Sequence, residues 1–163
     1  MQALAKQKHK DFFAILVGDD TQHPGFRGEV EKLIAEHQLE GHVRMVGSSP
    51  HMAEAYQLSK FVVATSVEPE AFGRVAIEAQ AMGKPVIATN HGGACETVKH
   101  SETGLLVKPG NVDDLASAIA ELLAMDGEQL GHIGQAGRIN AQNFSTRAMC
   151  DKVIAVYRGL LKA

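Results

Sequence analysis

Short apolar runs, each bounded by turn residues, recur along the chain and predict five β-strands. Runs of this kind suit the strands of a parallel sheet, in which both faces are covered. The first run is followed by Gly18, Asp19 and Asp20, and we expect its strand to be buried on both faces. The predicted strands cover residues 12–17, 42–47, 61–66, 85–89 and 104–107.

Between these runs, apolar residues recur three and four positions apart, which is the spacing of one face of a helix. In one such segment Leu115, Ile119 and Leu122 fall on the same side. Ser145 is a typical cap for the last helix, which we expect to continue to Leu161. The predicted helices cover residues 29–37, 50–58, a segment that begins near 72–73, 95–98, 113–124, the glycine-rich segment 127–142, and 145–161.

The alternation of strands and helices predicts an α/β fold, in which a parallel sheet carries helices on both faces. Ligands bind such sheets beyond the carboxyl ends of the strands. The loops 18–20, 47–50, 66–73 and 89–93 are therefore the expected functional loops. The opening sequence MQALAKQKHK reads as the tail of a helix, whereas α/β domains normally open on a strand. Our hypothesis is that the chain is a fragment and that the first strand of its single domain, residues 1–163, is missing.

Composition excludes several classes of function. The net charge of -3 argues against a general nucleic-acid binder, and the absence of Trp with only 5% aromatic residues argues against a platform for stacked bases. No apolar run approaches the roughly 20 residues that span a bilayer, and the start lacks the apolar stretch of a signal peptide. The two cysteines form no C-x-x-C pair and are typical of reduced thiols. We expect a cytoplasmic protein, with a peripheral membrane association of the full-length protein left open.

The stretch EPEAFGRVAIEAQAMGKP, residues 68–85, combines groups that suit a nucleotide carrying a sugar. If a helix begins near Phe72 and Gly73, its first amides lack partners within the helix and form, with the helix dipole, a site for phosphate. Gly73 lets the backbone approach the ligand. Glu78 lies about 7–8 Å further along the helix axis, where its carboxylate suits a ribose diol. Glu70 precedes the helix and is expected to face neutral sugar hydroxyls, because a carboxylate repels phosphate.

Other residues have plainer interpretations. Acids near a helix start also suit the dipole, and Arg74 is equally suited to phosphate or to solvent. His91 and Cys95 lie four positions apart, but zinc needs three or four ligands, so we expect no metal site. The chain has no G-x-S-x-G elbow and no G-x-G-x-x-G after a strand, which disfavours a hydrolase or a dehydrogenase. Three further groups are interpreted as turn residues (18–20), solvated lysines (Lys6, Lys8 and Lys10) and a core cysteine (Cys150).

Taken together, these motifs resemble the donor-binding, C-terminal domain of retaining glycosyltransferases with the GT-B fold, the "glycosyl transferases group 1" family. The family pattern has two glutamates on either side of Phe-Gly, then an Ala-rich helix, G-x-P-V-I-A, and a Gly-Gly turn followed by Glu. The segments AILVGDD, GLLVKPGNVDDLASAI and NFSTRAMCDKVIAVYRGLL fit the same family, so the likeness covers nearly the whole chain. The matching positions are Glu70, Phe72, Gly73, Glu78, residues 83–88, Gly92, Gly93 and Glu96.

The resemblance implies a Rossmann-like domain, one half of an enzyme that transfers a sugar from a UDP-, GDP- or ADP-linked donor with retention at the anomeric carbon. It implies no cofactor and no metal, because helix amides and basic side chains stabilise the leaving phosphate. The acceptor site is implied to lie in a missing N-terminal Rossmann-like domain. The implied donor-binding residues are Glu70 (catalytic, on the donor sugar), Phe72, Gly73 and Arg74 (diphosphate), Glu78 (ribose), Gly92 and Gly93 (close approach near the sugar), and Met45 and Ser48 (base).

The chain departs from the family pattern near its start. The family usually has a Gly-Arg and a downstream Lys-Gly there, and both are absent from this sequence, their usual place being before Met1. We therefore expect the isolated chain to bind donor weakly and to be inactive alone. Two alternatives remain open: half of a sugar-nucleotide epimerase of the same architecture, and a non-catalytic module with a glycosyltransferase-like fold.

Overall fold

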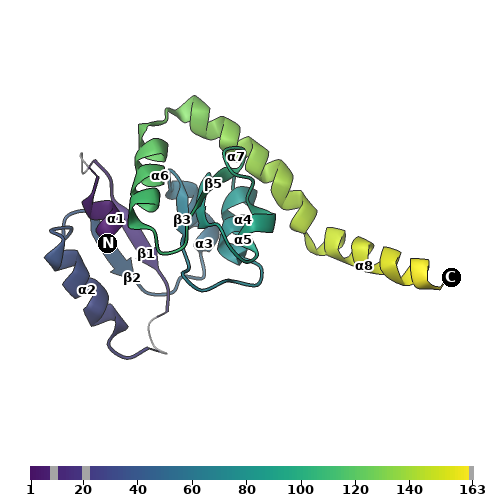
Figure 1. Ribbon diagram of the computed structural model, residues 1–163, viewed down its shortest axis with the longest axis horizontal. Helices are drawn as coiled ribbons and strands as arrows, with labels where there is room; N and C mark the ends of the chain where they lie inside the picture. The colour runs from purple at the N-terminus through teal and green to yellow at the C-terminus, as the bar shows by residue number, and fades with distance from the viewer. Residues whose placement is uncertain (8–10, 20–22, 162–163) are drawn as a thin grey trace.

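The computed structural model describes residues 1–7, 11–19 and 23–161 and has the predicted α/β class (Figure 1). Lys8, Lys10 and Asp20, which the sequence analysis interpreted, lie outside the described residues. The strands are β1 (Ala14–Val17), β2 (Val43–Val46), β3 (Val62–Ala64), β4 (Val86–Thr89) and β5 (Gly104–Val107). The helices are α1 (Gln2–Ala5), α2 (Phe26–Glu36), α3 (Met52–Leu58), α4 (Arg74–Ala81), α5 (Ala94–Thr97), α6 (Val112–Ala124), α7 (Gly127–Ala141) and α8 (Thr146–Leu160), with a 3-10 turn η1 (Gln142–Phe144).

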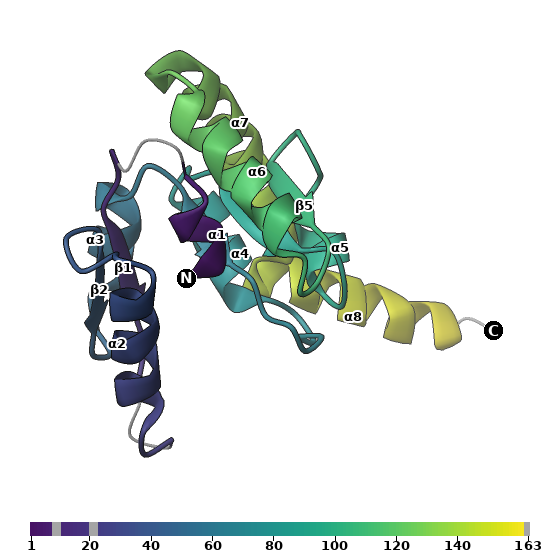
Figure 2. The same cartoon turned by 60° about the vertical axis from the view of Figure 1, so that its left-hand side comes forward.

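All described strands pair in parallel, but they form two sheets instead of the single sheet that the sequence predicts. One sheet pairs β1 with β2, with Ala14 opposite Val43, and the other has the order β3-β4-β5. In the part of the chain that the structure describes, β1 and β3 therefore each have one edge without a strand partner. Figure 2 shows the β1–β2 sheet with α2 set apart from the larger sheet.

The larger sheet has helices on both faces, as predicted. Val86 and Ala88 of β4 pack with α4 and α5 residues in one core, whereas Ile87 between them packs with α6 in another. This alternation is the period of two of a strand covered on both sides. α1 packs against α6, and the Lys6 side chain next to it pairs with Asp113 at the start of α6.

The prediction that the first strand is buried on both faces is wrong. Ile15 and Leu16 are 57% and 37% exposed, although they point to opposite faces of β1. Among the described residues, β1 has a strand neighbour only on its β2 side. The side chains of a second neighbouring strand, which would cover part of Ile15 and Leu16 on the two faces, are therefore not there.

Two glycines of α7, Gly134 and Gly137, serve helix packing, which their weak helix propensity does not predict. Gly134 faces the backbone of Gly83 so closely that a Cβ at position 134 would lie 2.1 Å from the Gly83 carbonyl oxygen. Gly137 lies in the same way against the Gln80 side chain of α4. These contacts hold α7 against α4. They therefore help to position α4, the helix that carries the candidate site.

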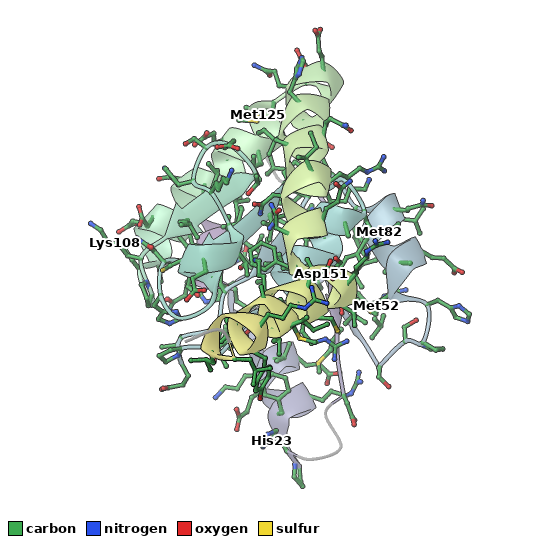
Figure 3. The ribbon with its side chains drawn as sticks, turned by 90° about the vertical axis from the view of Figure 1, so that its right-hand side faces the viewer. His23, Met52, Met82, Lys108, Met125 and Asp151 are labelled. Atoms are coloured by element: carbon green, nitrogen blue, oxygen red, sulfur yellow. The ribbon has the colours of Figure 1, made fainter. Side chains whose placement is uncertain are left out.

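The last helix projects from the body of the molecule (Figure 1), and Figure 3 shows Asp151 on it beyond the end of α7. Ser145 caps it as predicted, accepting a hydrogen bond from the Ala148 amide at 3.2 Å. α8 has no buried residue, so the prediction that Cys150 belongs to the core is wrong, and its thiol is free and exposed. The described residues include no helix with the length and apolarity required to cross a membrane.

Candidate functional site

The amino end of α4 has the geometry expected of an anion site. Gly73 is the N-cap residue with φ 74°, a left-handed conformation that glycine adopts without a steric penalty, and the helix begins at Arg74. No side chain caps this end within the described residues. The first amides of α4 are therefore left without intrahelical acceptors, and the predicted helix start near Phe72 and Gly73 is confirmed.

A pocket lies next to this helix end, at the carboxyl ends of β3 and β4. Glu70 and Gly73 both line it, so the predicted sugar-facing carboxylate and the N-cap glycine meet at one place. Its cavity volume of about 10 Å³ is far below the range of about 300–1,000 Å³ typical of small-molecule sites and has room for about one water molecule. The pocket therefore marks where the predicted site residues meet, and a nucleotide sugar would need the open surface around it. It is lined by Ala64, Ser66, Glu70, Gly73, Ala76, Ala88, Thr89, His91 and Ala94.

The loop that carries Glu70 is fixed to the turn after β4 by hydrogen bonds to its backbone. The Thr89 hydroxyl donates to the Ser66 carbonyl at 2.9 Å, and Nε2 of His91 lies 2.9 Å from the Val67 carbonyl. The Gly93 amide donates to the carbonyl of Glu70 itself at 2.8 Å. The turn thus sets where the Glu70 loop lies.

The glycine pair explains how the two backbones come so close. A Cβ on Gly92 would lie 2.6 Å from the Glu70 carbonyl oxygen, and one on Gly93 would lie 2.6 Å from the Phe72 Cα. Side chains at either position would push the Glu70 loop away. The family resemblance implies that Gly92 and Gly93 allow a close approach near the donor sugar. In the structure they allow a close approach to the backbone of the Glu70 loop, and an approach to the donor sugar stays a prediction.

The carboxylate of Glu78 has partners for both oxygens. Oε1 accepts from the Arg74 guanidinium at 3.0 Å, and Oε2 accepts from the Tyr56 hydroxyl at 2.9 Å. Burial raises the pKa of the Tyr56 hydroxyl to about 12; the hydrogen bond to Glu78 and the charge of its carboxylate act in the same direction, and Arg74 acts against them. Glu78 does not line the pocket, and its side chain is 38% exposed. Its proposed role on ribose stays a prediction.

The remaining predicted site residues lie at varying distances from the pocket. Phe72 contacts Phe144 edge to face, with ring centroids 6.0 Å apart, and Arg74 has an 82% exposed side chain. Met45 belongs to β2 of the smaller sheet, and Ser48 is an exposed residue in the loop that follows. Neither Met45 nor Ser48 lines the pocket, so the structure brings together the α4 residues and the glycine turn, but not the two residues predicted for the base.

Sequence reasoning missed the residues that hold this site in place. Tyr56 carries no sequence signal, because its partner Glu78 is far away in the chain. Gln80, Thr97 and Asn140 form a buried network in which the Asn140 amide donates to Gln80 Oε1 at 2.8 Å and to the Thr97 carbonyl at 2.9 Å. The one sequence signal for this network was a Gln on the inner side of an Ala-rich helix. A buried polar side chain requires hydrogen-bond partners, so Gln80 indicated that such partners exist.

His91 and Cys95 make separate contacts within the protein. The Cys95 thiol lies 3.3 Å from Asn90 Oδ1, and its side chain is exposed. No cluster of three or more His, Cys, Asp or Glu side chains suited to a metal ion occurs in residues 1–7, 11–19 and 23–161.

Comparisons with known proteins identify the family of the chain. The family model described as "Glycosyl transferases group 1" matches residues 1–140. A D-inositol 3-phosphate glycosyltransferase of Rhodococcus jostii is 40% identical over 107 residues, which are 66% of this chain and 23% of that protein. This chain therefore spans about a quarter of the length of that curated relative.

Solved structures agree with the family model. A glycosyltransferase from Rickettsia africae ESF-5 has a TM-score of 0.92 and 40% identity, over 99% of this chain and 43% of that one. Anabaena Alr3699/HepE in complex with UDP-glucose has a TM-score of 0.86 and 31% identity, over 96% and 43%. The C-terminal domain of a glycosyl transferase group 1 family protein (LpcC) from Francisella tularensis has a TM-score of 0.76 and 26% identity, over 87% and 75%. The chain belongs to the glycosyl transferases group 1 family and has the fold of one half, the C-terminal domain, of a GT-B glycosyltransferase.

Proposed function

We propose that this chain is the donor-binding domain of a retaining glycosyltransferase and binds a nucleoside diphosphate sugar at the amino end of α4. The observation that carries the proposal is the pocket shared by Glu70 and Gly73, beside a helix end that no described side chain caps. The likeness to Anabaena Alr3699/HepE, which was solved with UDP-glucose, supports this class of ligand.

The proposed roles follow from the positions of the groups. The amides of Arg74 and Val75 face the diphosphate, because helix amino ends favour anions. Glu70, whose loop is fixed by the turn after β4, accepts hydrogen bonds from the sugar hydroxyls. When the sugar leaves, negative charge grows on the diphosphate, and the helix amides stabilise it without having to rearrange.

Glu78 keeps acceptor capacity for ribose, because each carboxylate oxygen accepts two hydrogen bonds and the structure gives each of them one partner. The exposed Arg74 side chain is the partner that can move: a diphosphate at the helix end attracts its guanidinium and frees Oε1. Tyr56 keeps its hydrogen bond to Oε2 and holds the carboxylate in place. Arg74 therefore links the phosphate and ribose positions.

We also propose that a full enzyme needs protein beyond this domain. The chain covers 43% of the Rickettsia and Anabaena chains, and the acceptor site is assigned to the remainder. In the Rossmann order 3-2-1-4-5-6, the first strand lies between the second and the fourth. Among the described residues, β1 and β3 each have an edge without a strand partner, which is the pairing that this order leaves when its first strand is left out.

Ligand titration tests the proposal. UDP, GDP and ADP, free and sugar-linked, are titrated into the chain while the amide resonances of Arg74 and Val75 are followed by NMR. Glu78→Ala is expected to weaken nucleotide binding about tenfold without weakening the binding of inorganic pyrophosphate, because it releases Arg74, whereas Glu121→Ala on the exposed face of α6 changes neither. Because weak binding is expected, the titration extends to the highest soluble nucleotide concentrations; no response to any nucleotide there contradicts the proposal and favours the non-catalytic module.

A further inference from the structure

We infer that His91 is a positioning residue for Glu70: its hydrogen bond to the Val67 carbonyl holds the Glu70 loop so that the carboxylate faces the donor sugar. The inference rests on the proposed donor-binding function and deepens it. It assigns His91 to recognition of the sugar, and leaves recognition of the nucleotide to the helix end and Glu78.

The beginning of the Glu70 loop has few side-chain contacts. Every residue from 67 to 72 is exposed, and Val67 is 67% exposed, whereas the later part of the loop packs against the glycine turn and, through Phe72, against Phe144. A loop with few buried contacts samples many conformations unless its backbone is bonded. The position of its first residues therefore depends on the hydrogen bonds that they accept from Thr89 and His91.

These hydrogen bonds lie at two places in the loop, at the adjacent residues Ser66 and Val67 and at Glu70. Thr89 bonds to its beginning at Ser66, and the Gly93 amide bonds to Glu70. His91 bonds to Val67 between them. Without the His91 bond, Val67 and Glu68 would be held only by Ser66 before them and by Pro69, which packs against Gly92, after them.

The chemistry of the His91 ring fits a positioning role better than a packing role. Because a carbonyl only accepts, the hydrogen must lie on Nε2, and Nδ1 is then an acceptor. Nδ1 is buried and has no hydrogen-bond partner among the described residues. A buried polar atom without a partner is unfavourable, so a side chain retained only for packing would be apolar. The bond made by Nε2 is the feature that His91 provides and an apolar residue cannot.

Three variants separate this role from a general structural one. His91→Leu keeps a side chain of similar size but removes the donor, whereas His91→Gln places an amide donor at nearly the position of Nε2. His132→Leu is the matched control, because His132 is an exposed histidine on α7, outside the pocket.

The first readout is hydrogen exchange of the Gly93 amide, which bonds to Glu70 and needs no ligand. His91→Leu is expected to accelerate this exchange about tenfold relative to the amides of β4, because opening of the loop breaks the bond. His91→Gln and His132→Leu are expected to match the unaltered chain. Equal exchange in His91→Leu and the unaltered chain overturns the inference.

The second readout is the gain in affinity that the sugar provides, measured as the Kd ratio of UDP to UDP-glucose and of GDP to GDP-mannose. The larger of the two ratios belongs to the preferred donor, and His91→Leu is expected to reduce it to near one. The Kd of the free nucleotide is expected to change by less than about twofold. His91→Gln is expected to restore the ratio. If His91→Leu weakens free nucleotide and nucleotide sugar equally, His91 acts on the fold and the inference is wrong. If the unaltered chain binds none of the four ligands, the donor function is refuted, whereas the exchange readout still decides whether His91 holds the loop.

Discussion

Gly93→Ala tests whether close contact of the glycine turn with the Glu70 loop is required. Gly93 has φ -62° and ψ -20°, which alanine adopts freely, so any effect of the substitution is steric. The new Cβ would lie 2.6 Å from the Phe72 Cα and 2.7 Å from the Ala71 carbonyl oxygen, where ordinary contact begins at 3.4 Å. Both are backbone atoms, so the loop itself has to move by about 0.8 Å or more.

A shift of this size has consequences for stability and for binding. Overpacking of a close contact destabilises a protein by about 1–3 kcal/mol, and each kcal/mol lowers the Tm of a chain of this size by roughly 2–4 °C. Misplacement of a substrate-contacting group by about 1 Å reduces turnover up to about 100-fold, and the same shift is expected to remove the affinity gained from the donor sugar. Gly92→Ala should destabilise more, because Gly92 also has a left-handed φ of 56°.

Urea denaturation and donor titration of the same samples measure both effects. Gly131→Ala is the control: Gly131 lies within α7 with nothing within 4 Å of a Cβ, so alanine there should stabilise by about 0.5–1 kcal/mol. If Gly93→Ala is as stable as the unaltered chain and binds nucleotide sugar equally well, the reasoning that close contact positions the loop is refuted.

Three further predictions concern Tyr56 and the contact between α4 and α7. Tyr56→Phe leaves Glu78 without one of its donors and should lower the free energy of unfolding by about 1.5–3 kcal/mol, the range for hydrogen bonds to charged groups, as measured by urea denaturation. Because the pKa of Tyr56 is raised to about 12 from its usual 10, its contribution to stability is complete below pH 10 and is lost as the pH rises through 12. Absorbance titration of tyrosinate in Tyr157→Phe, which leaves Tyr56 as the one tyrosine of the sequence, should give this raised value, and a midpoint near 10 would contradict it. Gly134→Ala should destabilise by about 1–3 kcal/mol in thermal unfolding, since its Cβ would meet the Gly83 carbonyl at 2.1 Å, and an unchanged Tm would show that the helices move apart at no cost.

The features that sequence predicted well depend on neighbours in the chain. The start of α4 at Arg74 follows from a glycine before an Ala-rich run, and the cap at Ser145 follows from its place before an apolar helix. Residues 104–107 form β5 within the predicted bounds. Such local signals fix where an element begins and ends, because caps and turns are set by a few adjacent residues.

The features that sequence did not predict depend on residues far apart in the chain. The apolar run of β1 gave no sign that Ile15 and Leu16 would be exposed, because burial depends on which strands flank it. A cysteine in a helix-like segment is expected in a core, whereas α8 has no buried residue and Cys150 is exposed. An apolar pattern shows that a face can be buried, and only tertiary contacts show whether it is.

The candidate site joins these two kinds of information. Its chemistry is local, since Glu70, Gly73 and Glu78 lie within nine residues of one another on one loop and one helix. Its rigidity is not local: Tyr56 on α3 holds Glu78, and the turn after β4 holds Glu70. Arg74, 82% exposed, is the partner of Glu78 with the freedom to turn toward a diphosphate. In the proposed function, the two carboxylates, which are held from different elements, keep a sugar and a ribose at a fixed spacing. The Arg74 side chain at the helix end between them then adjusts to the charge of the diphosphate.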